Sequence, residues 1–454
     1  MRDRADTPRL RRLIGALPAP PAAARPIGII EVELSEPLPT IRPEGCAAAQ
    51  VLVLLHGQPL GMLKVSLEQG PVVGRALRAA VERELHDALH DHLKRDGLDQ
   101  PAAVSGNGHQ PLCLRDLEPP DPPPRVTVVI ATCDRARQLA SCLDSLTRLA
   151  YPAFDVVVVD NAPSDESTRD LVEGRFGEHS NIRYVREPRA GVSNARNVGA
   201  RMGRGDIVAF TDDDVVVHRL WLKALVRGFA DPRVTCVTGL TLPGRLETAA
   251  EQAFEEYGSM SLGFERCVYD RDRHRGRTRL YPYSAGIFGA SNNAAFRRAD
   301  FLRRGGFDLT LGPGTPAGGA EDLDAFLAVI LAGERIVYDP RAMVRHEHRS
   351  DFRQLYWQVF MYSAGFTAFL TKWALTDRSV GRDLLRRVPP QLPAALFHRQ
   401  RSDFEDHGEY LRQLRWLERA GYLYGPVAYA RSRLAAARAT GDRARPRPTA
   451  QERA

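Results

Sequence analysis

Three consecutive carboxylates, Asp212, Asp213 and Asp214, stand between two apolar runs in the stretch FTDDDVVV. Like charges this close repel one another, so the arrangement calls for a compensating partner. Mg²⁺ and Mn²⁺ prefer oxygen ligands and usually share their coordination shell with substrate phosphates. A divalent cation would explain all three acids, whereas a helix N-cap ahead of VVVHRLWLKAL would explain only one.

The segments around these acids alternate between strand patterns and helix patterns. Apolar runs typical of buried strands occur at four places: 126–132, 154–160, 181–188 and 206–212. Strands that are apolar on both faces and alternate with helices predict a mostly parallel, Rossmann-like α/β sheet with helices on both faces. Ligands bind at the carboxyl ends of such strands, and Asp134, Asp160 and the three acids fall there.

Several motifs occur in a characteristic order between residues 125 and 350, half of the chain. They are PRVTVVIATCDR, VVVVDNAPSDES, PRAGVSNARNVGA, DIVAFTDDDV, GASNNAAFRR, GGFD, GAEDLDAF and VYDPRAMVRHEH. In order and spacing this series resembles the family-2 glycosyltransferases, inverting enzymes with the GT-A fold that use nucleotide-sugar donors. By this resemblance the acidic triplet is similar to the Asp-x-Asp motif of the family, which implies a site for the donor's ribose and for Mn²⁺ or Mg²⁺.

The resemblance implies a role for individual residues of the donor site. Asp160 would accept a hydrogen bond from the imide N–H of uracil or thymine, Asp212 would contact the ribose and metal region, and Asp214 would bind the metal directly. The other positions that it places against the donor are Thr132, Asp134, Gly191, Arg196, Asn197, Asp213, Ser291 and Asn292. Gly191 in addition permits close approach of the backbone to a ligand.

The resemblance also implies a catalytic pair and a third metal ligand. Inverting transfer needs a base for the acceptor hydroxyl, and GAEDLDAF is similar to the Glu-Asp motif of the family, so Asp322 is the candidate base with Glu321 beside it. These acids would also suit the first turn of a helix, and both roles can hold together. His346 completes the metal shell by the same resemblance, and His348 two residues on is the alternative.

The function implied is metal-dependent transfer of a sugar from a nucleotide-sugar donor, UDP- or dTDP-linked, to a hydroxyl of a saccharide, lipid-linked or small-molecule acceptor. The alternative is a non-catalytic nucleotide-sugar-binding or scaffold protein that keeps the fold. Nucleic-acid binding through the Arg-rich C-terminal region lacks a recognised motif and aromatic residues on a basic face, so no nucleic-acid partner is expected. The glycine- and proline-rich stretch 311–319 predicts a lid or acceptor loop.

Composition and pattern divide the chain into six segments. They are a disordered N-terminus (1–25), a small α+β domain (26–98), a Pro-rich linker (99–124), the catalytic domain (125–350), a helical C-terminal extension (351–440) and a disordered tail (441–454). The aromatic helix pattern at 352–376 fits packing under the catalytic domain, a homodimer contact or peripheral contact with a membrane. The 63 basic and 56 acidic residues leave a formal net charge of +7.

The cysteines and histidines outside the motifs carry no obvious metal pattern. Six cysteines show neither close pairs nor zinc-type spacing, which predicts free thiols in a reducing cytoplasm. His86 and His90 have an i, i+4 spacing, but they sit on a highly charged helix face without an evident third ligand. Apolar runs long enough to span a bilayer are absent from the sequence, so a cytoplasmic protein is expected, with contact at the inner face of the plasma membrane left open.

Overall fold

The computed structural model describes residues 14, 17, 25–42, 44–98, 111–276, 278–387 and 408–444, with side chains described except at 408–410 and 439–444. Most of the predicted N-terminal disorder (1–25) lies outside the described residues, as do residues 99–110 of the predicted linker and 445–454 of the predicted tail. Residues 441–444 belong to a helix. The C-terminal helical region thus continues past the boundary that composition suggested.

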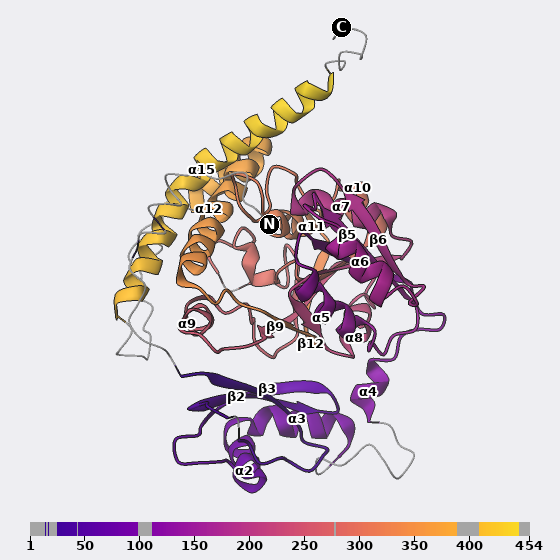
Figure 1. Cartoon of the computed structure of the whole chain (residues 1–454), viewed down its shortest axis with the longest axis vertical. Helices are drawn as coiled ribbons and strands as arrows, with labels where there is room; N and C mark the ends of the chain where they lie inside the picture. Colours follow the sequence, from indigo (N-terminus) through magenta and orange to yellow (C-terminus); the bar gives the residue numbers. More distant parts are fainter. Residues whose placement is uncertain are drawn as a thin grey trace.

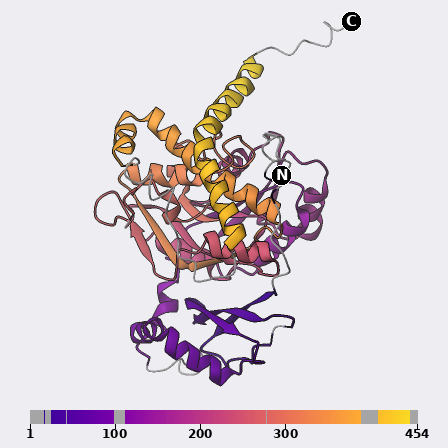
Figure 2. The ribbon, with the colours of Figure 1, turned by 90° about the vertical axis from the view of Figure 1, so that its left-hand side faces the viewer.

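The N-terminal domain is a three-stranded sheet backed by two helices. Strands β1 (Ile27–Glu33) and β2 (Ala48–Leu55) run parallel, and β2 pairs antiparallel with β3 (Gln58–Ser66). Helices α2 (Gly74–Glu84) and α3 (His86–Asp96) are separate because the chain leaves helical geometry at Leu85. Figures 1 and 2 show this domain on one side of the larger body.

The predicted linker is not extended throughout. Residues Leu112–Asp116 form the short helix α4, which lies at the junction of the two domains (Figure 1). On the sheet side of the same junction, Leu52 and Leu54 of β2 pack with Leu240 and Leu242 of the larger domain. The N-terminal domain is therefore joined to the rest of the chain by a buried apolar contact as well as by the linker.

A central nine-stranded sheet organises the larger domain of the described chain. Its order is β10-β12-β9-β11-β7-β4-β5-β6, with β8 paired to β12. The strands are β4 (Val126–Thr132), β5 (Phe154–Asn161), β6 (Ile182–Glu187), β7 (Ile207–Asp212), β8 (Val215–Val217), β9 (Val234–Pro243), β10 (Cys267–Tyr269), β11 (Asn293–Arg297) and β12 (Arg335–His346). The half from β7 to β6 is parallel as predicted, and β11 enters antiparallel between β7 and β9, so that the whole sheet is mixed.

Helices cover both faces of the parallel half, as the two-sided apolar strands require. On one face Val128 and Ile130 of β4 pack with Leu139 and Leu143 of α5 (Ala136–Leu146). On the other face Gly199 of α7 (Val192–Met202) lies so close to β4 that an added Cβ would come within 2.3 Å of a valine methyl group. This packing fixes the carboxyl ends of β4, β5 and β7 at one edge.

Further helices complete the larger domain and its C-terminal extension. They are α6 (Ser167–Asp170), α8 (Trp221–Gly228), α9 (Ala249–Gly258), α10 (Arg298–Arg303), α11 (Glu321–Leu331), α12 (Phe352–Thr376), α13 (Arg378–Arg387) and α15 (Gly408–Ala444). Helix α12 packs along α15, which projects beyond the body of the molecule (Figures 1 and 2). Lys372 of α12 donates to both oxygens of Asp324 in α11 at 2.7 Å, which ties the extension to the larger domain.

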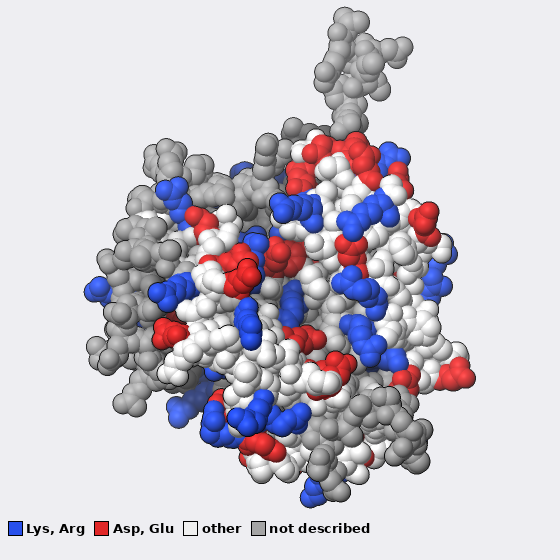
Figure 3. Space-filling view, turned by 60° about the horizontal axis from the view of Figure 1, so that its bottom comes forward, with Lys and Arg blue, Asp and Glu red and all other residues white. Residues whose placement is uncertain are grey.

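Charged side chains are paired across the surface. Figure 3 shows lysine and arginine interspersed with aspartate and glutamate over the described part of one face. Ion pairs such as Arg345 with Glu31, at 3.1 Å, connect the two domains.

Among the described helices, none is long and apolar enough to cross a membrane.

Candidate active site

The acidic triplet closes β7 and leads into another strand. Asp212 is the last residue of β7, and Asp213 and Asp214 form the turn into β8. The next helix, α8, begins only at Trp221 and has Leu220 at its N-cap position. The helix-cap explanation of the triplet is therefore wrong, and the acids owe their place to the strand edge.

Asp213 is buried and binds neighbours from β4 and from the turn between β4 and α5. Its carboxylate accepts hydrogen bonds from the Thr132 hydroxyl at 2.8 Å and from Arg135 at 2.6 Å. Burial raises the pKa of Asp213 to about 7, although the Arg135 charge opposes the rise. Thr132 and Asp213 thus support the turn, and their polar groups are directed at each other.

Arg135 is a member of the site that the sequence reasoning did not single out. Its guanidinium bridges Asp213 and Asp214, with a bond of 2.7 Å to Asp214. Burial raises the pKa of Asp214, but the adjacent His346 and Arg135 more than offset it and hold this pKa below its ordinary value. Arg135 belongs to the CDR stretch that follows β4, but the sequence has no pattern that relates it to two acids almost eighty residues away.

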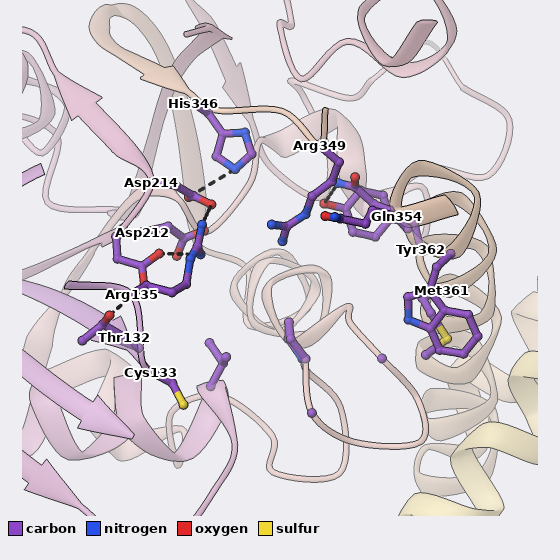
Figure 4. Close-up of a pocket in the computed structure, with 18 of the residues that line it drawn as sticks. Thr132, Cys133, Arg135, Asp212, Asp214, His346, Arg349, Gln354, Met361 and Tyr362 are labelled. Atoms are coloured by element: carbon purple, nitrogen blue, oxygen red, sulfur yellow. Dashed lines mark hydrogen bonds and ion pairs between the residues drawn. The ribbon is translucent and has the colours of Figure 1, made fainter. Parts of the chain in front are cut away.

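Asp212, Asp214 and His346 converge at one point. One potential ligand atom from each lies within 4.8 Å of the other two, and His346 Nε2 is 3.4 Å from Asp214 Oδ1. Neither Asp214 Oδ1 nor His346 Nδ1 has a hydrogen-bond partner among the described residues. Figure 4 shows the three side chains on one wall of a pocket. Two carboxylates and a histidine form a donor set suited to a divalent cation.

His348 lies apart from this group. Its ring packs edge-on against Phe254, and its Nε2 is 3.1 Å from Glu255 Oε2. In the extended segment that follows β12, these contacts direct His348 toward α9. Of the two histidines that the sequence offered, only His346 lies with the acids.

Arg196 joins the two acidic motifs. It is buried on α7 and donates to Asp212 at 2.5 Å and to Glu321 at 2.8 Å. A third hydrogen bond, at 2.8 Å, reaches the Ser291 hydroxyl. Arg196 was expected at the donor, and it does line the pocket, but its hydrogen bonds are made to the protein.

Replacing Arg196 with methionine should lower the free energy of unfolding strongly. The substitution leaves Glu321 buried without its cation, and breaking a buried ion pair on one side costs about 3–5 kcal/mol. Urea denaturation of the purified full chain measures the effect. Arg169→Met, which removes an exposed i, i+4 pair with Glu173, is the control and should cost less than about 0.5 kcal/mol. Equal losses in the two variants would contradict the structural role of Arg196.

Glu321 and Asp322 differ in exposure although they are adjacent. Both lie in the first turn of α11, after Ala320 in a left-handed conformation with φ of 81°. Glu321 is 3% exposed, and burial raises its pKa to about 7. Asp322 is half-buried and accepts hydrogen bonds from the backbone N–H groups of Ser291 at 3.0 Å and Leu323 at 2.8 Å. Of these two acids, Asp322 is the more exposed.

The ends of β4 and β5 carry the residues predicted to hold the nucleoside. Asp160 is fully buried: its Oδ2 accepts a bond of 2.9 Å from the Tyr184 hydroxyl, and its Oδ1 has no partner among the described residues. Burial raises the pKa of Asp160. Asp134 is exposed and accepts from the Ser164 N–H at 2.8 Å, which orders the loop after β5. Gly191, with φ of 133°, donates its N–H to Asn161 at 2.8 Å.

Two residues expected at the donor are engaged elsewhere. The Asn197 amide exchanges two hydrogen bonds of 2.8 Å with the backbone of Phe307, so it holds the loop after α10. Asn292 is buried, and its amide lies 3.4 Å from the Thr241 hydroxyl and 3.9 Å from the Met260 sulfur. The amide groups of both residues therefore contact the protein.

Helix α12 forms the wall opposite the acids. The pocket has a volume of about 770 Å³, and Figure 4 shows Met361 and Tyr362 of α12 facing Asp212 and Asp214 across it, with Arg349 between. Packing against the larger domain, one of the three alternatives for this helix, is observed, and its position as a pocket wall was not predicted. Pro313 and Gly314 of the predicted loop also line the cavity, and the loop is anchored by hydrogen bonds from Val192 and Ser193.

Comparison with known proteins agrees with the motifs and the fold. The family model for glycosyl transferase family 2 matches residues 127–302. The chain is 31% identical to the pre-mycofactocin glycosyltransferase of Mycobacterium tuberculosis over 308 residues, 66% of this chain and 56% of that protein, so it spans little more than half of that relative's length. It is 32% identical over 237 residues to the succinoglycan biosynthesis protein ExoM of Rhizobium meliloti, covering 50% of this chain and 69% of ExoM.

Solved structures of similar chains are more distant. The mannosyltransferase PcManGT from Pyrobaculum calidifontis, in complex with GDP-Man and Mn²⁺, is 22% identical, with a TM-score of 0.42 over 72% of this chain and 78% of that one. The family assignment therefore rests on the sequence relatives. The order of the motifs, the GT-A arrangement of the sheet and the ExoM match agree. The chain belongs to glycosyl transferase family 2.

Proposed function

We propose that this protein is an inverting glycosyltransferase that moves a sugar from a nucleotide-sugar donor to a hydroxyl group of a saccharide, lipid-linked or small-molecule acceptor. The observation that supports it best is the convergence of Asp212, Asp214 and His346 beside the pocket. Family membership supports the class of reaction, and these three potential metal ligands are the reason to propose that the reaction depends on a metal ion.

The residues present fit a divalent cation. Asp214 Oδ1 has no hydrogen-bond partner among the described residues and lies 3.4 Å from His346 Nε2. Burial lowers the pKa of His346, which favours the neutral ring that a metal ligand needs. Asp212, Asp214 and His346 would hold Mn²⁺ or Mg²⁺. Such an ion, when bound, neutralises the charge that develops on the departing diphosphate.

Basic side chains of the pocket suit the donor's phosphates. Arg349 is exposed three residues after His346, and its guanidinium points toward the acidic wall (Figure 4). Arg135 lies on that wall, and its charge is already shared between two acids. We assign to Arg349 the direct contact with the diphosphate, because a guanidinium can bind two phosphate oxygens at once.

Asp322 would act as the base. It is half-buried at the start of α11, and the two backbone N–H groups bonded to its carboxylate fix its orientation. As the acceptor oxygen attacks the anomeric carbon, Asp322 takes the hydroxyl proton, and the bond from that carbon to the diphosphate breaks. Glu321, buried against Arg196, holds the start of the helix in place.

The donor base would be uracil or thymine. Asp160 Oδ1 is a buried acceptor without a described partner at the end of β5, and the imide N–H of either base would satisfy it. Asp160→Asn should weaken UDP binding by about tenfold, which corresponds to one hydrogen bond to a charged group. Calorimetric titration measures the change, and unchanged affinity would remove Asp160 from base recognition.

Thermal-shift screening of nucleotide sugars with and without Mn²⁺ tests the proposed function. We expect one UDP- or dTDP-linked sugar to raise the melting temperature only when the metal is present, since ligands that bind only the native state stabilise it. Turnover of that donor then separates the enzyme from a binding or scaffold protein. Stabilisation without turnover in the presence of diverse acceptors would favour the scaffold, and no stabilisation by any donor would contradict the proposal.

A further inference from the structure

A second group of potential metal ligands lies in the N-terminal domain. His56 comes from the β2–β3 turn, His92 and Asp96 from α3, and Cys113 from α4. One ligand atom from each lies within 4.8 Å of all the others. The sequence showed no zinc-type spacing because the four residues come from three separate segments.

The distances within this group suit one small cation. His56 Nδ1 is 3.0 Å from Asp96 Oδ2 and 3.3 Å from Cys113 Sγ, and His92 Nε2 is 3.3 Å from the same Asp96 oxygen. In a tetrahedral zinc site, with bonds of about 2.0–2.1 Å to nitrogen and about 2.3 Å to sulfur, neighbouring ligand atoms are about 3.3–3.6 Å apart. The side chains are therefore close to the spacing that a shared ion would require.

Hydrogen bonding alone does not account for the cluster. The side chains of His56, His92 and Asp96 are 0%, 3% and 1% exposed. His92 Nε2 faces Asp96 but makes no hydrogen bond with any described group. An unpaired buried polar atom destabilises the fold, and a cation at the centre of the cluster would provide the missing partner.

Neighbouring groups hold the four residues in place. Asp96 Oδ1 accepts the Cys113 N–H at 2.7 Å, and Gln58 donates to the Cys113 carbonyl at 2.8 Å. His56 has a left-handed backbone with φ of 56°, and its N–H donates to Glu33 at 2.9 Å. Supporting bonds of this kind orient ligands in metal sites.

We propose that His56, His92, Asp96 and Cys113 form a structural zinc site. The mixture of thiolate, imidazole and carboxylate suits Zn²⁺ better than Mg²⁺ or Ca²⁺. Four protein ligands close a tetrahedral shell and leave no position for a substrate, which is the arrangement of structural and not of catalytic zinc. When zinc binds, the thiol of Cys113 releases its proton to the solvent, and the resulting thiolate sulfur is the fourth ligand.

The site would brace the junction between the two domains. Helix α4, which carries Cys113, also carries Asp116, and Asp116 accepts hydrogen bonds from Arg227 at 2.9 Å and from Arg341 at 2.8 Å in the larger domain. Figure 1 shows α4 between the domains. An ion that joins α4 to α3 and to the β2–β3 turn would add to the apolar contact there, which is useful for a domain with a small core of its own.

Metal analysis of the purified full chain tests this site. After incubation with Zn²⁺ and gel filtration we expect about one tightly bound zinc ion per chain, the stoichiometry of a single structural site. Cys113→Ser and His92→Ala should lose the ion and show a lower melting temperature. His86→Ala, which changes an exposed histidine on the same helix, should retain it. Wild-type protein without bound zinc would overturn the proposal.

Cobalt substitution tests ligation by Cys113 in the wild-type protein, and so does not depend on how well the zinc-site variants fold. Wild-type protein loaded with Co²⁺ should show a thiolate-to-cobalt charge-transfer band. The band should disappear in Cys113→Ser and persist in Cys133→Ser, a matched change of a cysteine that lines the catalytic pocket. Asp214→Ala should keep the band, which separates this site from the proposed catalytic ion. A wild-type Co²⁺ spectrum without the band, or one that Cys113→Ser leaves unchanged, would refute ligation by Cys113.

Discussion

Asp322→Asn is expected to lower the rate of sugar transfer by about 10²–10⁴-fold, the contribution of a positioned general base. The amide keeps the shape of the side chain, and its single oxygen can still accept one of the two backbone N–H bonds from Ser291 and Leu323, but it cannot take a proton. Donor affinity should stay within about twofold of the wild type, because the base acts on the acceptor. Steady-state transfer assays together with donor titration measure both quantities.

Glu321→Gln provides the comparison for this variant. Glu321 is buried against Arg196, so its replacement should reduce stability more than Asp322→Asn does, and a change in rate should be accompanied by a lower melting temperature. Loss of activity in Asp322→Asn with an unchanged melting temperature supports the base. A rate close to that of the wild type would remove Asp322 from the mechanism.

Asp214→Asn is expected to abolish metal-dependent donor binding. The carboxylate is the member of the triplet that lies 3.4 Å from His346 Nε2 and has an oxygen without a described partner. The variant keeps only two of the three proposed metal ligands, so the ion should bind more weakly. Without the charge of the ion, the diphosphate of the donor is repelled by the carboxylate of Asp212. We expect donor affinity in Mn²⁺ to fall by at least about 100-fold, the upper end of the losses seen when groups around a metal are changed. Titration with and without metal is the measurement.

The two histidines at the end of β12 and just after it supply a matched pair for the same question. His346→Ala should weaken Mn²⁺ binding, whereas His348→Ala should alter stability alone, because His348 contacts Glu255 and Phe254 away from the acids. Mn²⁺ titration followed by electron paramagnetic resonance distinguishes them. Equal effects of the two changes on Mn²⁺ affinity would contradict the assignment of His346.

Local patterns were sufficient to predict the strands that carry the site. The apolar runs at 126–132 and 154–160 form β4 and β5, and the run that ends at Asp212 forms β7. Strands that are apolar on both faces and are connected by short helices are typical of a parallel sheet. The sequence therefore predicted that the acids at the ends of these strands lie at one edge of the sheet. The antiparallel position of β11 between β7 and β9 could not be predicted. It depends on the path of the long segment before β11, and hydrophobic periodicity does not indicate that path.

Contacts between distant segments were beyond the reach of the same reasoning. Arg135 bonds Asp213 and Asp214, and Asn197 turns to Phe307, because of side-chain packing that no spacing encodes. The aromatic pattern predicted a helix at 352–376 but not that it faces the acids. The cluster around Cys113 was missed for the same reason, since its members were judged by spacing along the chain.

The most direct measurement of the central claim is anomalous diffraction at the manganese absorption edge from crystals soaked with Mn²⁺ and UDP. The account predicts a peak bounded by Asp212, Asp214 and His346, with the diphosphate between the ion and Arg349. A peak elsewhere, or a nucleotide bound with no manganese beside Asp214, would contradict it.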